Sequence, residues 1–118
     1  MPTIMVVDDA SFMRQRCMKL LNDNGYDTLP ATNGREAVDK YVEHRPDAVL
    51  LDITMPDMDG VEALKEIMKL DKDAKIAMVT AIGQQGMVLQ CMKAGAKDFV
   101  VKPFDPPRLL AAVQKLLG

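Results

Sequence analysis

Short apolar runs alternate along the chain with longer stretches in which apolar residues return every third or fourth position. Nearly continuous apolar runs such as IMVV, AVLL and FVV are typical of parallel strands that are covered on both faces. The longer stretches are typical of helices with one buried face. The pattern predicts strands at residues 3–7, 26–31, 48–51, 75–79 and 99–101, each followed by a helix.

The ends of the helical stretches carry residues that favour helix starts and stops. Gly25 and Gly95 follow the first and fourth helical patterns, where a left-handed residue commonly ends a helix. Asp105 followed by Pro106 predicts an acidic N-cap and a first-turn proline for the last helix. Five β-α units in succession predict an α/β fold with a parallel sheet and right-handed crossovers.

Among such folds we expect the (βα)5 flavodoxin-like arrangement, a doubly wound five-stranded parallel sheet of order 2-1-3-4-5, by analogy with other proteins of this class. In this order the first and fifth helices cover one face of the sheet, and the other three cover the opposite face. Cys17 and Cys91 lie on the apolar faces of the first and fourth helical patterns. They would sit on opposite sides of the sheet, so we predict no disulfide between them.

The 118 residues fit one domain, residues 1–118, which can bury a core without disulfides or structural metal. The net charge of −2, with 15 scattered basic residues and no Trp, disfavours binding to nucleic acid. No apolar run has the length of a membrane span, and the apolar start lacks the basic flank of a signal peptide. We therefore expect a cytoplasmic monomer with no nucleic-acid or membrane partner.

Polar and charged residues stand where four of the predicted strands end. They are Asp8-Asp9 after the first strand, Asp52 after the third, Thr80-Ala81 after the fourth and Lys102-Pro103 after the fifth. In open parallel sheets, sites form beyond the carboxyl ends of the strands, where the strand order switches direction. Each signal alone is ordinary, because acids after strands are usually caps or turns and a Lys before Pro is usually at the surface. Together they predict one crevice with three carboxylates, a hydroxyl and an ammonium.

Such crowding of acids calls for a cation. Two unit charges about 4 Å apart repel by roughly 4 kcal/mol at an effective dielectric near 20. Mg²⁺ prefers oxygen ligands and commonly combines one or two carboxylates with phosphate oxygens. We therefore predict a Mg²⁺ site in which Asp52 acts as a nucleophile toward phosphorus, while Lys102 and the Thr80 hydroxyl meet the incoming oxygens.

Four segments, VVDDASFMR, LLDITMPDMDG, MVTAIGQQG and KAGAKDFVVKPF, resemble in order and spacing the motifs of response-regulator receiver domains. Through SFMR and AIGQQGMV the chain is most similar to stand-alone CheY-type chemotaxis regulators. The resemblance spans essentially the whole chain. It implies a two-component signalling protein that is not an enzyme beyond catalysing its own phosphorylation and dephosphorylation. It also implies a CheA-like histidine kinase as phosphodonor, and a flagellar motor switch component or an adaptor as downstream partner.

The resemblance also implies roles for individual residues. Asp52 would be phosphorylated and would bind Mg²⁺, with Asp9 as a direct ligand and Asp8 as a ligand through water. The backbone carbonyl of Thr54 would complete the protein ligands. The phosphoryl-binding positions of the family are matched by Thr80, the backbone of Ala81, and Lys102, whose bond to Pro103 is predicted to be cis.

The same resemblance implies a switch between two states. The Thr80 hydroxyl would be drawn toward the phosphoryl group, and Phe99 would move into the space behind it, although Phe99 could equally be a plain core residue. The output surface would be the fourth helix, the fifth strand and the fifth helix. Thr54 and Ile82 would flank the attacking water, and we expect the apolar Ile82 to make self-hydrolysis slow.

Three alternatives remain open at this point. A phosphohydrolase similar to the haloacid-dehalogenase group would need an acid two residues after the nucleophile, where this chain has Thr54. A flavodoxin-like flavin carrier would need a phosphate loop in place of Asp8-Asp9. An isolated receiver domain or phosphate sink of a non-chemotaxis two-component system fits the same motifs.

Overall fold

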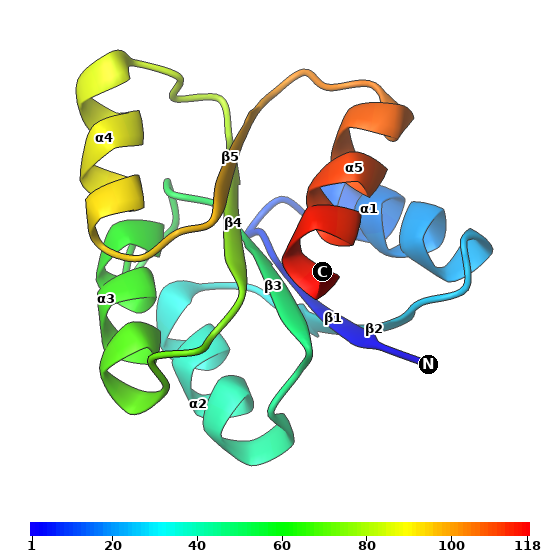
Figure 1. The fold of residues 1–118 in the computed structure, drawn as a ribbon, viewed down its shortest axis with the longest axis horizontal. Helices are drawn as coiled ribbons and strands as arrows, with labels where there is room; N and C mark the ends of the chain where they lie inside the picture. Colours follow the sequence, from blue (N-terminus) through cyan, green and yellow to red (C-terminus); the bar gives the residue numbers. More distant parts are fainter.

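A computed structural model describes residues 1–118 of the chain. One parallel sheet of order β2-β1-β3-β4-β5 lies between two helical layers, as Figure 1 shows. The predicted fold class and strand order are confirmed. The strands are β1 (Thr3–Val7), β2 (Asp27–Ala31), β3 (Ala48–Leu51), β4 (Ile76–Thr80) and β5 (Asp98–Val101). The helices are α1 (Ser11–Asp23), α2 (Gly34–His44), α3 (Gly60–Leu70), α4 (Gln85–Lys93) and α5 (Pro106–Leu117).

Four strand boundaries differ by one residue from the prediction: the start of β2, both ends of β4 and the start of β5. Tyr26 precedes β2, because its N–H bonds to the carbonyl of Leu21 and closes the end of α1. Next to the edge strand β5, β4 begins at Ile76 and runs on to Thr80, which pairs with Val101 of β5. Asp98 opens β5 by pairing with Ala77.

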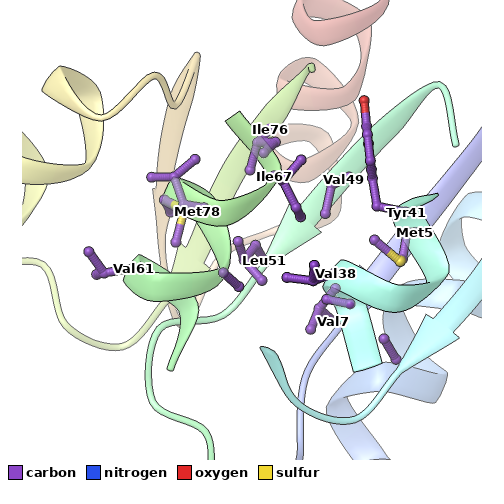
Figure 2. Packing of buried hydrophobic residues seen from close by; sticks show 14 of the residues in the cluster. Met5, Val7, Val38, Tyr41, Val49, Leu51, Val61, Ile67, Ile76 and Met78 are labelled. Atoms are coloured by element: carbon purple, nitrogen blue, oxygen red, sulfur yellow. The ribbon is translucent and has the colours of Figure 1, made fainter. Parts of the chain in front are cut away.

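Two apolar clusters fill the space between the sheet and its helices. The larger joins one face of the sheet to α2, α3 and α4, and Figure 2 shows Val38 of α2 and Val61 of α3 on either side of Leu51. The smaller joins the opposite face to α1 and α5. Cys17 belongs to the smaller cluster and Cys91 to the larger, and both are free thiols, as predicted. Burial raises the pKa of Cys17 to about 11.

The helices fall into two groups by how they begin. The side chains of Asn33, Asp59 and Asp105 cap α2, α3 and α5 by accepting a backbone N–H of the first turn. The residues that precede α1 and α4 provide no such bond. Gly25 and Gly95 follow α1 and α4 with φ of +90° and +116°, the predicted left-handed geometry. None of the helices combines the length and the apolar character needed to cross a membrane.

Candidate phosphoacceptor and metal site

Three acidic side chains meet beyond the carboxyl ends of β1 and β3. Asp8 and Asp9 follow the last residue of β1, and Asp52 follows β3, the neighbouring strand. One carboxylate oxygen from each of the three lies within 4.8 Å of the others. Asp8 and Asp52 are buried, whereas Asp9 is exposed. The sequence prediction that these residues share one crevice is therefore correct.

Lys102 reaches into this group from the end of β5, the edge strand. Its Nζ donates to Oδ2 of Asp8 at 2.7 Å and lies 3.3 Å from Oδ2 of Asp52. The Lys102 backbone N–H bonds to the carbonyl of Thr80 at 2.8 Å, and the Lys102–Pro103 peptide bond is cis, as predicted. The ammonium thus bridges the two buried carboxylates.

Backbone groups hold the other oxygens of the two buried acids. Oδ1 of Asp8 accepts the N–H of Ala10 at 2.9 Å, at the start of α1. Oδ1 of Asp52 accepts the N–H of Ile53 at 2.7 Å. Each carboxylate is therefore fixed by one backbone bond and presents its second oxygen to the crevice.

The electrostatics of the crevice are unbalanced toward negative charge. Burial raises the pKa of Asp52 and the charge of Asp8 adds to the rise, while Lys102 and the Thr80 hydroxyl oppose it. Burial alone would lower the pKa of Lys102, but its hydrogen bond to Asp8 and the two carboxylate charges raise the pKa above its usual value. Lys102 therefore stays an ammonium. One ammonium against three carboxyl groups leaves an all-oxygen donor set of the kind that suits a hard divalent cation.

The remaining predicted residues surround this centre at different depths. Thr80 is buried, and its hydroxyl accepts the N–H of Ile82 at 3.3 Å. Ala81 is exposed beside it, and Thr54 is exposed in the loop that follows Asp52. Ile82 and Phe99 are half-buried, and both pack against the larger apolar cluster. The structure does not test the roles of these residues, which stay predictions.

Two contacts that hold the crevice were not found from the sequence. The Arg14 side chain, on the first turns of α1, donates to the carbonyl of Asp8 at 2.7 Å. Gly60, the first residue of α3, lies so close to the carbonyl of Asp52 that a Cβ could not fit between them. The motif segments contain both residues, but their spacing alone gives no sign of these contacts.

The fold and this crevice define the class of protein. Residues 4–114 match the family described as the response regulator receiver domain, and the chain belongs to that family. It is similar to the chemotaxis protein CheY of Thermotoga maritima, with 54% identity over 114 residues, which is 96% of this chain and 95% of that protein. It is 53% identical over 116 residues to CheY of Bacillus subtilis, which is 98% of this chain and 97% of that protein. The chain is thus the receiver domain of a response regulator closely related to CheY chemotaxis proteins.

A solved structure agrees with this relationship. The structure described as the CheX-CheY-BeF3-Mg²⁺ complex from Borrelia burgdorferi is similar to this chain with a TM-score of 0.95 and 38% identity. The match covers 98% of this chain and 89% of that chain. Membership of the receiver family favours a signalling protein over the phosphohydrolase and flavin-carrier alternatives.

Proposed function

We propose that the chain, as one receiver unit, is a cytoplasmic, monomeric response regulator that accepts a phosphoryl group on Asp52 from a CheA-like histidine kinase. The observation that carries this proposal is the bridge from Lys102 to both Asp8 and Asp52, at 2.7 and 3.3 Å. It places an ammonium directly beside the oxygen that would receive the phosphoryl group. The similarity to CheY proteins supports a role in chemotaxis.

The residues of the crevice fit a magnesium ion. Asp8, Asp9 and Asp52 would hold it with the backbone carbonyl of Thr54, because carboxylate and carbonyl oxygens are the ligands Mg²⁺ prefers. When bound, the ion neutralises charge on the phosphoryl oxygens. The Borrelia burgdorferi structure is described as a complex that contains both Mg²⁺ and BeF3, which supports magnesium binding by this chain.

In the proposed reaction Oδ2 of Asp52, the oxygen that faces Lys102 and the crevice, attacks the phosphorus of phosphohistidine. The new P–O bond forms as the P–N bond breaks, and the imidazole of the kinase leaves with the electron pair and takes up a proton. Lys102, which already contacts Asp52, would move its donors toward the phosphoryl oxygens. The Thr80 hydroxyl and the N–H of Ala81 would supply further donors.

The signal would leave through α4, β5 and α5. Movement of Thr80 toward the phosphoryl group would make room for Phe99, which already packs against the apolar cluster beneath α4. The same side of the molecule exposes apolar side chains, Leu89 and Met92 on α4 and Val101 on β5. Exposed apolar groups of this kind suit a protein partner, such as a flagellar motor switch component or an adaptor. They favour an output role over that of a phosphate sink.

The test is incubation with acetyl phosphate, with and without Mg²⁺, followed by intact mass measurement and hydroxylamine treatment. We expect one hydroxylamine-labile phosphoryl group that requires Mg²⁺ and is absent in Asp52→Asn. Asp57→Asn, which alters an exposed acid in the adjoining loop, is the matched control and should be phosphorylated like the wild type. Phosphorylation that persists in Asp52→Asn would contradict the proposal.

The lifetime of the acyl phosphate is a separate part of the proposal. Ile82 is half-buried and apolar, and Thr54 is exposed and uncharged, so neither side chain brings a charged group to orient water. We expect Ile82→Glu to speed the loss of the phosphoryl group. An unchanged rate in this variant would show that Ile82 does not control hydrolysis.

A further inference from the structure

The loop that joins β3 to α3 follows Asp52 directly and contains Thr54. The two ends of the loop are joined at its base by a hydrogen bond of 2.8 Å from the N–H of Gly60 to the carbonyl of Ile53. Within the loop, the N–H of Met58 bonds to the carbonyl of Pro56 at 2.8 Å. The loop is therefore tied at the end nearest the crevice and has a tight turn at its far end.

Gly34, the first residue of α2, contacts this far end across more than twenty residues of sequence. Its N–H donates to the carbonyl of Met58 at 3.0 Å. A Cβ at Gly34 would overlap the Met58 carbonyl oxygen and would stand 2.9 Å from the carbonyl carbon. Because these atoms are backbone, they cannot turn aside as the end of a side chain can.

The position of Gly34 is itself fixed. The Asn33 side chain caps α2 by accepting the N–H of Glu36 at 2.8 Å. Gly34 is buried, and its φ lies outside the left-handed region that favours glycine. The glycine is therefore required by the close approach of two backbones, and not by the geometry of a turn.

We propose that Gly34 is a positioning residue for the magnesium site, because its contact with Met58 sets the shape of the loop that presents the Thr54 carbonyl. The inference rests on the proposed function of the crevice. A larger residue at position 34 would push the Met58 peptide away from α2. The hydrogen bond between Gly60 and Ile53 fixes the base of the loop. The displacement would therefore be taken up by the residues between Ile53 and Met58, which include Thr54.

The first test compares Mg²⁺ affinities of wild type, Gly34→Ala and Gly86→Ala, measured by calorimetry. Gly86 lies in the first turn of α4, and a Cβ there would meet nothing within 4 Å, so Gly86→Ala is the same chemical change without the clash. Loss of groups that orient metal ligands typically weakens metal binding about tenfold or more. We expect a weakening of about tenfold in Gly34→Ala and none in Gly86→Ala. Equal affinity in all three proteins would overturn the inference while leaving the proposed function intact.

The second test uses the wild type alone and does not depend on the folding of a variant. If Mg²⁺ binding and the Gly34–Met58 hydrogen bond support the same loop shape, each must stabilise the other. Mg²⁺ should therefore slow hydrogen exchange of the Gly34 amide. The Lys97 amide, which bonds to Ile76 at the opposite end of the sheet, should not change. If Gly34→Ala does not fold, the exchange measurement on the wild type decides: an unchanged exchange rate of the Gly34 amide on adding Mg²⁺ overturns the inference. A wild type that binds no Mg²⁺ overturns the proposed function as well.

Discussion

The two ends of the sheet each hold a carboxylate next to a cation, but they do so with opposite results. At the carboxyl end, Asp52 lies beside Lys102 and the second buried acid, Asp8. At the amino end, Asp71 accepts a hydrogen bond of 2.7 Å from the Tyr41 hydroxyl and lies 3.5 Å from Arg45. Figure 2 shows the Tyr41 oxygen directed away from the apolar cluster that buries its ring.

The pKa values of the two acids move in opposite directions. The Tyr41 hydroxyl, the N–H of Asp73 and the charge of Arg45 lower the pKa of Asp71, whereas burial and Asp8 raise the pKa of Asp52. Burial and Asp71 raise the pKa of Tyr41 to about 12, so it remains a donor at physiological pH. At the amino end, the negative charge of Asp71 thus has its partners within the fold. The carboxyl end keeps an excess of negative charge, which is the property that a site for a divalent cation needs.

Replacing Lys102, the ammonium that bridges the two buried carboxylates, should have the largest effect on stability. Lys102→Met would leave Asp8 and Asp52 buried without a partner, and removing one member of a buried ion pair typically costs about 3 kcal/mol or more. We expect the free energy of unfolding in urea, measured without Mg²⁺, to fall by about 3 kcal/mol.

The control for this variant is Lys97→Met, which removes an exposed ammonium from the same edge of the sheet. Its effect should be close to zero, because exposed charges contribute little. A Lys102→Met protein as stable as this control would show that the carboxylates do not depend on the ammonium.

Tyr41→Phe should have a smaller effect, confined to the amino end. The ring would stay buried, but Asp71 would lose its shortest hydrogen bond, 2.7 Å from the Tyr41 hydroxyl. We expect a lower free energy of unfolding than in wild type, with unchanged Mg²⁺ affinity. Tyr26→Phe removes a hydroxyl from a half-buried ring at the other side of the sheet, and is expected to have a smaller effect still. A change in Mg²⁺ affinity in Tyr41→Phe would contradict the separation of the two ends.

The smallest expected effect is the change with pH in the stability that Tyr41→Phe loses. The pKa of Asp71 is lower in the folded protein than its ordinary value. The ionised Asp71 therefore contributes fully to the stability of the fold above the ordinary carboxyl pKa of about 4. This stability is lost as the pH falls through the pKa that Asp71 has in the folded protein. The difference in unfolding free energy between wild type and Tyr41→Phe should therefore be constant near neutral pH and shrink below about pH 4. A difference that grows on acidification would contradict the assigned direction.

The two ends also differ in what the sequence could predict. The pair Asp8-Asp9 comes directly after β1, and Asp52 comes directly after β3, so strand order and the rule for parallel sheets were enough to bring them together. Tyr41 and Asp71 are 30 residues apart on two helix ends, and no local pattern links them. The Gly34–Met58 contact escapes prediction for the same reason, because it depends on the distance between two backbones in the finished fold.

The starts of two helices, in contrast, carry a local signal in the sequence. Asn33 and Glu36, like Asp59 and Glu62, have the spacing of helix N-caps, and the structure shows both caps. The extension of β4 to Thr80 had no such signal, since it comes from pairing with the neighbouring strand β5. Local patterns thus predicted the elements, and pairing with β5 decided where β4 ends.

The excess negative charge of the crevice is proposed to bind a divalent cation. Urea unfolding of wild type and Asp9→Asn, with and without Mg²⁺, tests it most directly, because Asp9 is the exposed member of the acidic group. Without Mg²⁺ we expect Asp9→Asn to be at least as stable as wild type, since one repulsive charge is gone. With Mg²⁺ wild type should gain stability and become the more stable of the two. If Mg²⁺ stabilised neither protein, or both equally, the claim would be contradicted.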